Sequence, residues 1–314
     1  MIVRALVVSN MRPDAAHPAR GRFVRDQVAA LRGLGGAEVE LYEFPPGPAE
    51  LGRAFGELRR RYARAERFDV VHAHFGLTAW PALALRPRIR ALTMHGTDLA
   101  DPRTRLATRA VLGLIDLPAA VSAQLAAQIP GRARARAEVL PTGVDTGRFE
   151  PIDRAAARAE LGLPAGEPLL LFAADPARPE KRFDRAEALA QRTAATLLAL
   201  ENVEPERVPL FVNAANAVLV PSEREGFGLA ALEALACDVP VLATPVGVHA
   251  EALAGIAGTL CAPFDLDVWT RALAPLLQEQ DPRVAGRAAA ERFSARAMAE
   301  RVRDAWRSAL QSCR

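Results

Sequence analysis

Two glutamates, Glu225 and Glu233, stand eight positions apart around a segment whose composition suits the binding of a phosphorylated ligand. Gly226 and Gly228 follow the first glutamate, and strong helix formers surround the second. The apolar run at 217–220 predicts a buried strand just before them, so the segment is expected to join a strand to a helix start. Backbone N–H groups at a helix start lack partners within the helix and can hold an anion such as a phosphate.

The spacing of the two carboxylates is typical of a site for one extended ligand. Eight residues make slightly more than two helical turns, which places Glu233 roughly 12 Å along the helix from Glu225. Carboxylates accept hydrogen bonds from hydroxyls, so the first would suit a sugar and the second a ribose diol. The alternative is a pair of ordinary charges, one at the helix start and one in solvent. The apolar neighbours of Glu233 argue against it, because an unpaired carboxylate among them would be costly.

A single lysine, Lys181, occurs among the 40 basic residues of the chain. It follows the apolar run 169–174, in a segment that also contains Arg178. Lysine carries a compact charge on a flexible stem, which suits a phosphate in a crowded site and which arginine does not replace there. We therefore interpret Lys181 as a phosphate ligand, with chance placement as the alternative.

Apolar runs alternate with helical segments along the chain, which predicts an α/β fold with parallel sheets. Strands are expected at 3–8, 39–42, 70–72, 91–94, 118–121, 168–174, 196–200, 217–220, 240–244 and 257–261. The pattern occurs twice, so we predict two doubly wound, Rossmann-like domains that face each other across a cleft. The predicted boundaries are 1–163 for the first domain, 164–294 for the second, and 295–314 for a C-terminal helix that returns to the first domain.

Chemically active side chains and glycines are concentrated where the predicted strands end. Ligands of open α/β sheets bind at these carboxyl ends. The candidates are Gly21, His72, His74, His95, Asp98, Arg178, Lys181 and Glu225. They are therefore expected to face the cleft.

Four histidines need separate interpretations. His72 and His74 have the period-two spacing that points both to one strand face, but no third ligand lies near them, so acceptor-side or structural roles are favoured over a metal site. His95 is interpreted as a general base or a hydrogen-bond donor, with a buried core histidine as the alternative. His249 is expected at the surface of a helix start. No metal and no cofactor are expected.

Composition and charge bear on the cellular setting. The three cysteines are widely spaced and are expected to be reduced thiols in a cytoplasm. No secretion signal and no membrane-spanning run is recognised. Residues 1–150 carry 22 basic and 15 acidic side chains, an excess that favours an anionic acceptor or peripheral contact with the inner face of the membrane, for example through residues 57–67. A solvated helix face is the alternative. Nucleic acid is not expected as a partner.

The chain resembles the retaining nucleotide-sugar glycosyltransferases of family 4, which have the two-domain GT-B fold. The likeness covers nearly the whole chain and is strongest over the Glu-x7-Glu segment, with Pro221-Ser222 before it and 239–247 after it. Further matches are Asp69-Val-Val-His-Ala-His74, His95-Gly96, Val121-Ser122 and Pro141-Thr-Gly-Val-Asp145. Together these motifs are more specific than any one of them.

The resemblance implies a role for each matching residue. Glu225 would contact the donor sugar, Glu233 the ribose, and His95 would lie beside the reacting sugar. Lys181 and Arg178 would bind the pyrophosphate. The remaining donor-binding residues implied are Gly21, Gly226, Phe227, Gly228 and Leu229. The catalytic set is then Glu225, His95 and Lys181, and His72, His74 and Asp98 are acceptor-side candidates.

Three departures from the family pattern accompany the likeness. The usual Gly-Arg dipeptide is Ala173-Ala174, a strand and helix between Leu200 and Glu204 are missing, and the amino-terminal glycine pair is reduced to Gly21. The implied function is transfer of a sugar from a nucleoside-diphosphate sugar to an acceptor hydroxyl, in the synthesis of a cell-envelope polysaccharide or glycolipid. The acceptor is expected to be lipid-linked or anionic. The alternatives are a sugar-nucleotide epimerase of similar fold and a binding scaffold without turnover.

Overall fold

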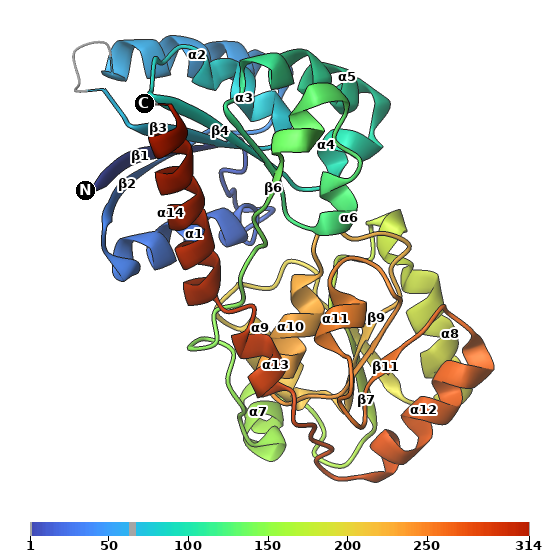
Figure 1. The fold of residues 1–314 in the computed structure, drawn as a ribbon. Coiled ribbons are helices and arrows are strands. Elements are labelled where there is room, and N and C mark those ends of the chain that lie inside the picture. The colour runs from blue at the N-terminus through green and yellow to red at the C-terminus, as the bar shows by residue number, and fades with distance from the viewer. Residues whose placement is uncertain (1, 63–66, 314) are drawn as a thin grey trace. The chain divides into compact units, whose positions relative to one another are not determined.

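The computed structural model describes residues 2–62 and 67–313, and its backbone divides into two compact units. Unit 1 comprises Met1–Gly143 and Ala295–Arg314, and unit 2 comprises Val144–Ser294. Each unit is built around a sheet in which every paired strand of the described residues is parallel, with helices on both faces (Figure 1). The α/β class predicted from the alternating pattern is therefore confirmed.

Six strands form the sheet of unit 1, in the order β2-β1-β3-β4-β5-β6. Their bounds are β1 (Val3–Ser9), β2 (Ala37–Glu43), β3 (Val70–His74), β4 (Ile89–Met94), β5 (Leu117–Ala120) and β6 (Glu138–Val139). The apolar runs of β1 and β3 are almost wholly buried, as expected for central parallel strands. The strand order reverses between β1 and β3, and the carboxyl ends at such a switch point are where doubly wound sheets bind ligands.

Helices cover both faces of this sheet. On one face lie α1 (Arg22–Leu34) and α14 (Ala295–Ser312), whose apolar sides share a core with alternate residues of the strands. On the other lie α2 (Pro48–Tyr62), α3 (Gly76–Ala82) and α5 (Pro102–Val111) (Figure 1). The shorter elements are α4 (Thr97–Ala100), η1 (Leu112–Leu114), α6 (Ala123–Ala126) and η2 (Gly131–Arg136).

Helix α14 is the last element of the chain and completes unit 1. It packs along α1, and its Met298, Val302, Trp306 and Leu310 are 2% exposed or less. Burial of such side chains stabilises a fold by about 1.5–3 kcal/mol each. The core of unit 1 is therefore assembled from segments that lie at opposite ends of the chain.

Five strands form the sheet of unit 2, in the order β11-β10-β9-β7-β8. Their bounds are β7 (Leu169–Phe172), β8 (Thr196–Ala199), β9 (Ala217–Val220), β10 (Val241–Ala243) and β11 (Leu260–Cys261). Here the order reverses between β7 and β9, which places the switch point between the ends of these two strands. Residues 200–207 join β8 to the next helix without a helix or strand of their own.

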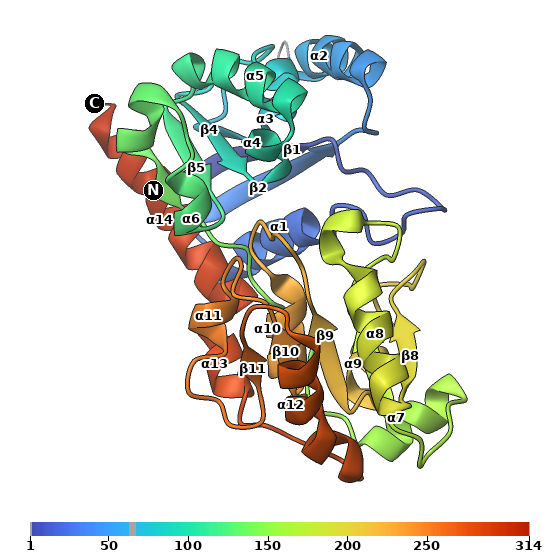
Figure 2. The same ribbon diagram turned by 90° about the vertical axis from the view of Figure 1, so that its right-hand side faces the viewer.

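The helices of unit 2 cover both faces of its sheet, and alternate strand residues point to opposite faces. Leu170, Phe172 and Leu219 point to the face covered by α8 (Phe183–Thr193) and α12 (Leu266–Gln278). The other face carries α9 (Val208–Ala214) and α10 (Leu229–Ala236) (Figure 2). The remaining elements are α7 (Arg154–Leu161), η3 (Pro179–Lys181), α11 (His249–Ala252) and α13 (Arg287–Glu291).

The predicted strands agree with the observed ones to within a few residues, and the C-terminal helix α14 was also expected. The two-residue strand β6 was not predicted, because so short a segment carries no periodicity. Helix α2 contains residues 57–62 of the basic segment 57–67, and residues 63–66 of that segment lie outside the described residues.

Candidate active site

Lys181 and Glu225 meet at the switch point of unit 2. Lys181 ends the turn η3 after β7, and Glu225 lies in the loop after β9. The Nζ of Lys181 donates to both carboxylate oxygens of Glu225, at 2.7 Å each. The side chains of Lys181 and Glu225 are 13% and 9% exposed, so the two charges neutralise each other where little solvent reaches them.

The loop that carries Glu225 is fixed by hydrogen bonds on both sides. Ser222 Oγ donates to Glu225 Oε1 at 2.8 Å, and Thr244 Oγ1 donates to the carbonyl of Ser222 at 2.5 Å. The backbone N–H of Glu223 donates to the carbonyl of Glu180 at 2.9 Å, which joins this loop to the turn that carries Lys181. The position of the ion pair is therefore set by backbone and side-chain bonds together.

The glycine loop at 226–228 leads directly into α10. Gly228 has a φ of 111°, and a Cβ there would lie 2.4 Å from Nε2 of His249. Val248 N donates to the carbonyl of Phe227 at 2.7 Å, and Phe227 is 7% exposed. The N-cap residue of α10 is Gly228, which has no side chain to cap the helix that begins at Leu229. The first N–H groups of α10 are therefore available to an anion.

His249 is buried, which corrects the prediction that it lies at the surface of a helix start. Its side chain is 0% exposed, and its Nδ1 lies 2.9 Å from the carbonyl of Thr244. Burial lowers the pKa of His249, so the ring is neutral near pH 7. The prediction failed because α11 packs against the glycine loop at 226–228. The local sequence does not reveal this contact between two separate segments. His249 is a part of this site that sequence reasoning missed.

Glu233 lies one turn into α10, four residues after Leu229. Burial raises the pKa of the Cys237 thiol to about 12, and the charge of Glu233 adds to that rise. The side chain of Glu233 is neither fully buried nor fully exposed. Its assignment to the ribose stays a prediction.

Arg178 does not join the Lys181–Glu225 pair. Its guanidinium donates to Glu180 Oε1 through Nε at 3.0 Å and through a terminal nitrogen at 2.7 Å, and the side chain is 55% exposed. A neighbouring arginine, Arg182, has a φ of 58° and pairs with Asp184 and Glu223. The turn after β7 therefore presents Lys181 inward while its arginines bind acidic neighbours.

In unit 1, three histidines form a continuous stack at the ends of β3 and β4. The rings of His72 and His74 lie 4.9 Å apart, and those of His74 and His95 lie 5.1 Å apart. His74 Nδ1 and His95 Nε2 are hydrogen-bonded at 2.9 Å. Burial lowers the pKa of His72 and of His95 to about 3 and holds that of His74 well below its usual value. All three rings are therefore neutral at physiological pH.

Trp306 anchors the inner end of this stack. Its Nε1 donates to His72 Nδ1 at 3.2 Å, and His72 Nε2 lies 2.8 Å from Thr93 Oγ1. All of these side chains are 1% exposed or less. Trp306 comes from α14, 234 positions after His72, so the sequence held no signal for this contact.

Asp98 braces the turn that carries His95. Its Oδ2 accepts from the backbone N–H of His95 at 2.6 Å, and its Oδ1 accepts from the N–H of Gly76 at 2.5 Å. The carboxyl group is 3% exposed; burial raises its pKa, and the backbone N–H donors oppose that shift. Asp98 therefore positions His95 and Gly76 in this structure, and its role toward an acceptor stays a prediction.

Gly21 lies at the start of α1 with a φ of 69°, and a Cβ there would lie 2.4 Å from the carbonyl oxygen of Met11. Only glycine fits this turn without a shift of the backbone. The arginines beside it are paired, Arg20 with Asp14 and Arg22 with Asp26. Close backbone approach is therefore the property that Gly21 contributes after β1.

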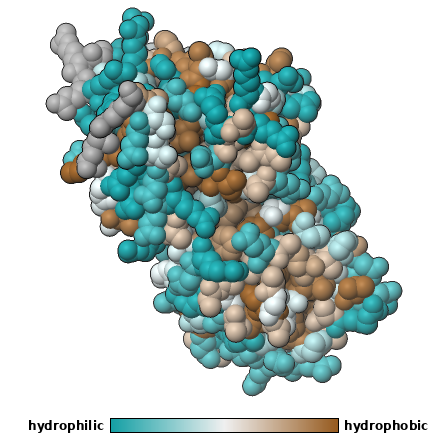
Figure 3. All heavy atoms as spheres, in the orientation of Figure 1, coloured by the Kyte–Doolittle hydropathy of each residue, from teal (hydrophilic) through white to brown (hydrophobic). Residues whose placement is uncertain are grey.

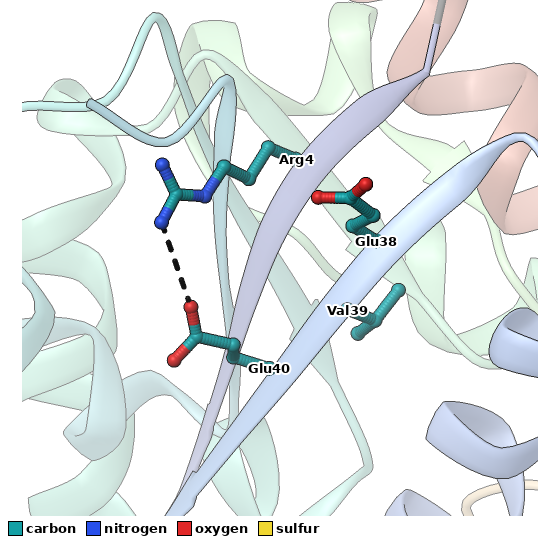
Figure 4. A pocket seen from close by; sticks show the side chains of 4 residues that line it. All are labelled: Arg4, Glu38, Val39 and Glu40. Carbon is teal, nitrogen blue, oxygen red and sulfur yellow. Dashed lines mark ion pairs between the residues drawn. The ribbon is translucent and has the colours of Figure 1, made fainter. Parts of the chain in front are cut away.

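A hollow of about 340 Å³ lies elsewhere in unit 1, between the amino-terminal halves of β1 and β2. Arg4, Glu38, Val39 and Glu40 line it, and Arg4 reaches Glu40 at 3.9 Å (Figure 4). None of the predicted site residues lines this hollow. Within residues 2–62 and 67–313, no three His, Cys, Asp or Glu side chains are arranged to hold a metal ion.

The comparisons with known proteins agree across both units. Residues 155–294 match the family model for glycosyl transferases group 1, and residues 2–148 match that for glycosyltransferase family 4. A D-inositol 3-phosphate glycosyltransferase of Nocardia farcinica is 30% identical over 86% of this chain and 71% of its own. One from Mycolicibacterium paratuberculosis is 38% identical over 87% and 72%.

Solved structures with low sequence identity share the fold. Sucrose-phosphate synthase from Thermosynechococcus elongatus matches with a TM-score of 0.75 at 20% identity, over 99% of this chain and 100% of its own. HepE of Anabaena, solved in complex with UDP-glucose, matches with a TM-score of 0.71 at 17% identity, over 97% and 99%. The family match, the relatives and the fold agree, and the chain therefore belongs to glycosyltransferase family 4, with the GT-B fold, and is a glycosyltransferase.

Proposed function

We propose that this enzyme transfers a sugar from a nucleoside-diphosphate sugar to an acceptor hydroxyl, with retention of the anomeric configuration. The observation that carries the proposal is the pairing of Lys181 with Glu225 beside the uncapped start of α10. A cation and helix N–H groups suit a diphosphate, and a carboxylate suits sugar hydroxyls. These groups stand at the switch point of one sheet, where doubly wound folds bind nucleotides.

Donor binding exchanges the partner of Lys181. The diphosphate replaces the carboxylate of Glu225 on Nζ, and Glu225 then accepts hydrogen bonds from the donor sugar. Negative charge grows on the leaving diphosphate as the bond to the sugar breaks, so Lys181 and the N–H groups of α10 stabilise the transition state. Phe227 and Gly228 hold the loop close enough for backbone contact, and Glu233 binds the ribose.

His95 acts in the proposed reaction as a hydrogen-bond donor. A histidine at this place could also serve as a general base, but an imidazole with a pKa of about 3 accepts a proton poorly near neutral pH. Its neutral ring retains one N–H that can bind a sugar or acceptor oxygen. The donor role is therefore favoured.

The acceptor is proposed to be a hydroxyl on an anionic or lipid-linked molecule of the cell envelope. Two facts support an anionic acceptor: the excess of basic side chains in residues 1–150, and relatives named D-inositol 3-phosphate glycosyltransferase. His72, His74 and Asp98 lie at or just after the strand ends of unit 1 and are assigned to the acceptor side. Gly21, which directly precedes α1, is assigned to the phosphates of the donor.

Peripheral contact with an anionic membrane is proposed through the face of unit 1 formed by α2, α3 and α5. Phe55, Trp80 and Leu106 are 40%, 39% and 72% exposed on these helices. Hydrophilic side chains border apolar ones over the same helices (Figure 3). The exposed arginines there are Arg53, Arg59, Arg60, Arg61, Arg103, Arg105 and Arg109. No described helix is long and apolar enough to cross a bilayer.

Flotation with anionic and neutral vesicles tests the proposed contact of this face with a membrane. Equal binding to both kinds of vesicle would overturn the charge argument.

The transfer itself is tested by incubating the protein with UDP-, ADP- and GDP-linked sugars and a set of polyol phosphate and lipid acceptors. A product with retained anomeric configuration, determined by NMR, is expected with one donor class. Lys181→Ala should lower kcat about 10²–10³-fold, whereas Arg192→Ala, at an exposed arginine on α8 that pairs with Asp267, serves as the control. An inverted product would contradict the assignment.

Two other outcomes would support the alternative functions. Conversion of the donor sugar without any acceptor would indicate an epimerase. Binding of sugar nucleotides by calorimetry without hydrolysis or transfer, over the whole acceptor set, would indicate a scaffold.

A further inference from the structure

We infer that His74 is a positioning residue that holds His95 in the neutral tautomer with its proton on Nδ1. The inference concerns the hydrogen bonds of unit 1 alone, and its consequence for catalysis rests on the proposed function of His95. It follows from where each ring nitrogen of the histidine stack finds a partner.

The tautomer of His72 is determined by its two partners. A tryptophan indole can only donate, so Trp306 Nε1 requires an unprotonated Nδ1 on His72. The proton of the neutral His72 ring is therefore on Nε2, which donates to Thr93 Oγ1 at 2.8 Å. This leaves His72 with no N–H for its stacked neighbour, His74.

His74 has one ring nitrogen with a partner and one without. Nδ1 is bonded to His95 Nε2, whereas Nε2 is buried and has no hydrogen-bond partner among the described residues. If the proton were on Nε2, a buried N–H would be left without an acceptor. If the proton is on Nδ1, only the lone pair of Nε2 is left without a donor. Buried N–H groups without an acceptor are rarer in proteins than buried acceptors without a donor. The geometry thus favours donation from His74 Nδ1 to His95 Nε2.

The ring of His95 is held firmly enough for this bond to persist. Its centroid lies 4.8 Å from that of Phe23 and 4.6 Å from that of Phe75. Phe75 adopts a φ of 73°, unusual for an aromatic residue, and its N–H donates to the carbonyl of Thr93. Asp98 accepts from the backbone N–H of His95. The side chain therefore has little freedom to turn and exchange its two nitrogens.

With Nε2 of His95 occupied as an acceptor, its proton is on Nδ1. Among the described residues, no hydrogen bond to His95 Nδ1 is formed. His95 therefore presents an N–H to its surroundings and binds an oxygen there as a donor. The hydrogen bond from His74 Nδ1 to His95 explains why position 74 in β3 is a histidine and not an aliphatic residue.

Long-range proton–nitrogen NMR of ¹⁵N-histidine-labelled protein measures the tautomers directly. His95 and His74 are expected to carry the proton on Nδ1, and His72 on Nε2. A protonated Nε2 on His95 would overturn the inference. This measurement does not depend on turnover, so absence of glycosyl transfer would refute the proposed function and leave the tautomer result standing.

A pair of variants at position 74 separates positioning from packing. His74→Asn keeps an amide N–H near the place of Nδ1, and His95 should retain its tautomer. His74→Leu removes the donor, so a mixture of His95 tautomers and a kcat about 10- to 100-fold lower are expected, with an unchanged KM for the donor. Trp306→Phe should shift the signals of His72 only. An unaltered His95 tautomer in a folded His74→Leu protein would contradict the inference.

Discussion

Lys181 Nζ lies 2.7 Å from both carboxylate oxygens of Glu225, although the two residues are 44 positions apart in the chain. The pair joins the ends of β7 and β9 across the switch point of unit 2. It neutralises the cation that a diphosphate would bind and occupies the carboxylate that a sugar would bind. In this state the lysine and the carboxylate neutralise each other. A ligand can therefore bind Lys181 or Glu225 only by breaking the ion pair between them.

Glu225→Gln should strengthen the binding of free UDP, ADP or GDP about threefold to tenfold, because the phosphate no longer competes with a carboxylate for Lys181. The same change should lower kcat by about 10²–10³-fold, since the sugar loses its charged acceptor. Titration calorimetry with the nucleoside diphosphate measures the first effect. Glu223→Gln, a 55% exposed carboxylate in the same loop, is the control and should change neither. Weaker diphosphate binding by Glu225→Gln would show that the two anions do not compete.

Gly228→Ala should weaken donor binding and destabilise unit 2 by about 1–3 kcal/mol, since the new Cβ would meet the buried ring of His249 and the φ of 111° would be strained. Gly255→Ala is the matched control, because Gly255 also has a positive φ, 76°, but no heavy atom lies within 4 Å of the place its new methyl group would take. Chemical denaturation followed by circular dichroism compares the two. Equal losses would mean that backbone strain alone, and not contact with His249, makes glycine necessary at 228.

The free energy of unfolding should fall as the pH is lowered from about 6.5 toward 5.5. Unfolded histidines have a pKa near 6.5, whereas burial lowers the pKa of His72 and His95 to about 3 in the fold. Between these values the unfolded chain binds more protons than the native one, so acid favours unfolding, and above about pH 7 these groups contribute no slope. Each buried histidine adds a slope of up to about 1.4 kcal/mol per pH unit.

Variants test the origin of that slope through urea midpoints at pH 7.5, 6.5 and 5.5. His72→Gln should flatten it, because the amide does not titrate and keeps a donor for Thr93. Burial raises the pKa of Asp98, which contributes a slope of the opposite sign, so the slope of His72→Gln is compared with that of the wild type under the same conditions. A slope that survives in His72→Gln would exclude His72 as its source.

Trp306→Ala should destabilise unit 1 by about 3–5 kcal/mol, because a fully buried indole is removed and His72 loses its donor. Trp80→Ala is the comparison in the same unit; Trp80 is 39% exposed, so a loss of about 1 kcal/mol is expected. Hydrogen exchange of peptides from β3 and β4 resolves the effect within unit 1. Similar protection in both variants would show that α14 contributes little to this sheet.

Local patterns were enough to predict most of the fold. The apolar runs at β1, β3 and β9 are buried parallel strands of four to seven residues, and such runs bounded by polar segments carry a clear signal. The eight-residue helix α7 begins at the Asp153 cap and ends before Gly162, both visible in the sequence. Short elements such as β6 and η3 carry no such signal, because two or three residues cannot show a period.

The candidate site was predicted as a set of residue types but not as a set of contacts. Spacing and composition pointed to Glu225, Lys181 and the glycine loop, and the histidine pattern pointed to the ends of β3 and β4. His249 was wrongly predicted to lie at the surface, and the role of Trp306 was missed, because both depend on segments that come together only when the chain folds. The assignments to donor and acceptor stay predictions that the variants above can test.

The sequence by itself determined the α/β alternation, the place of the glycine loop at a helix start, and the residue types able to bind a phosphate and a sugar. These properties depend on intrinsic preferences and on neighbours within a few positions. Only the tertiary structure decided that Lys181 pairs with Glu225 and that Trp306 sets the proton of His72. Such contacts join distant parts of the chain, and hydrogen bonds and burial select them only after the sheets have brought those parts together.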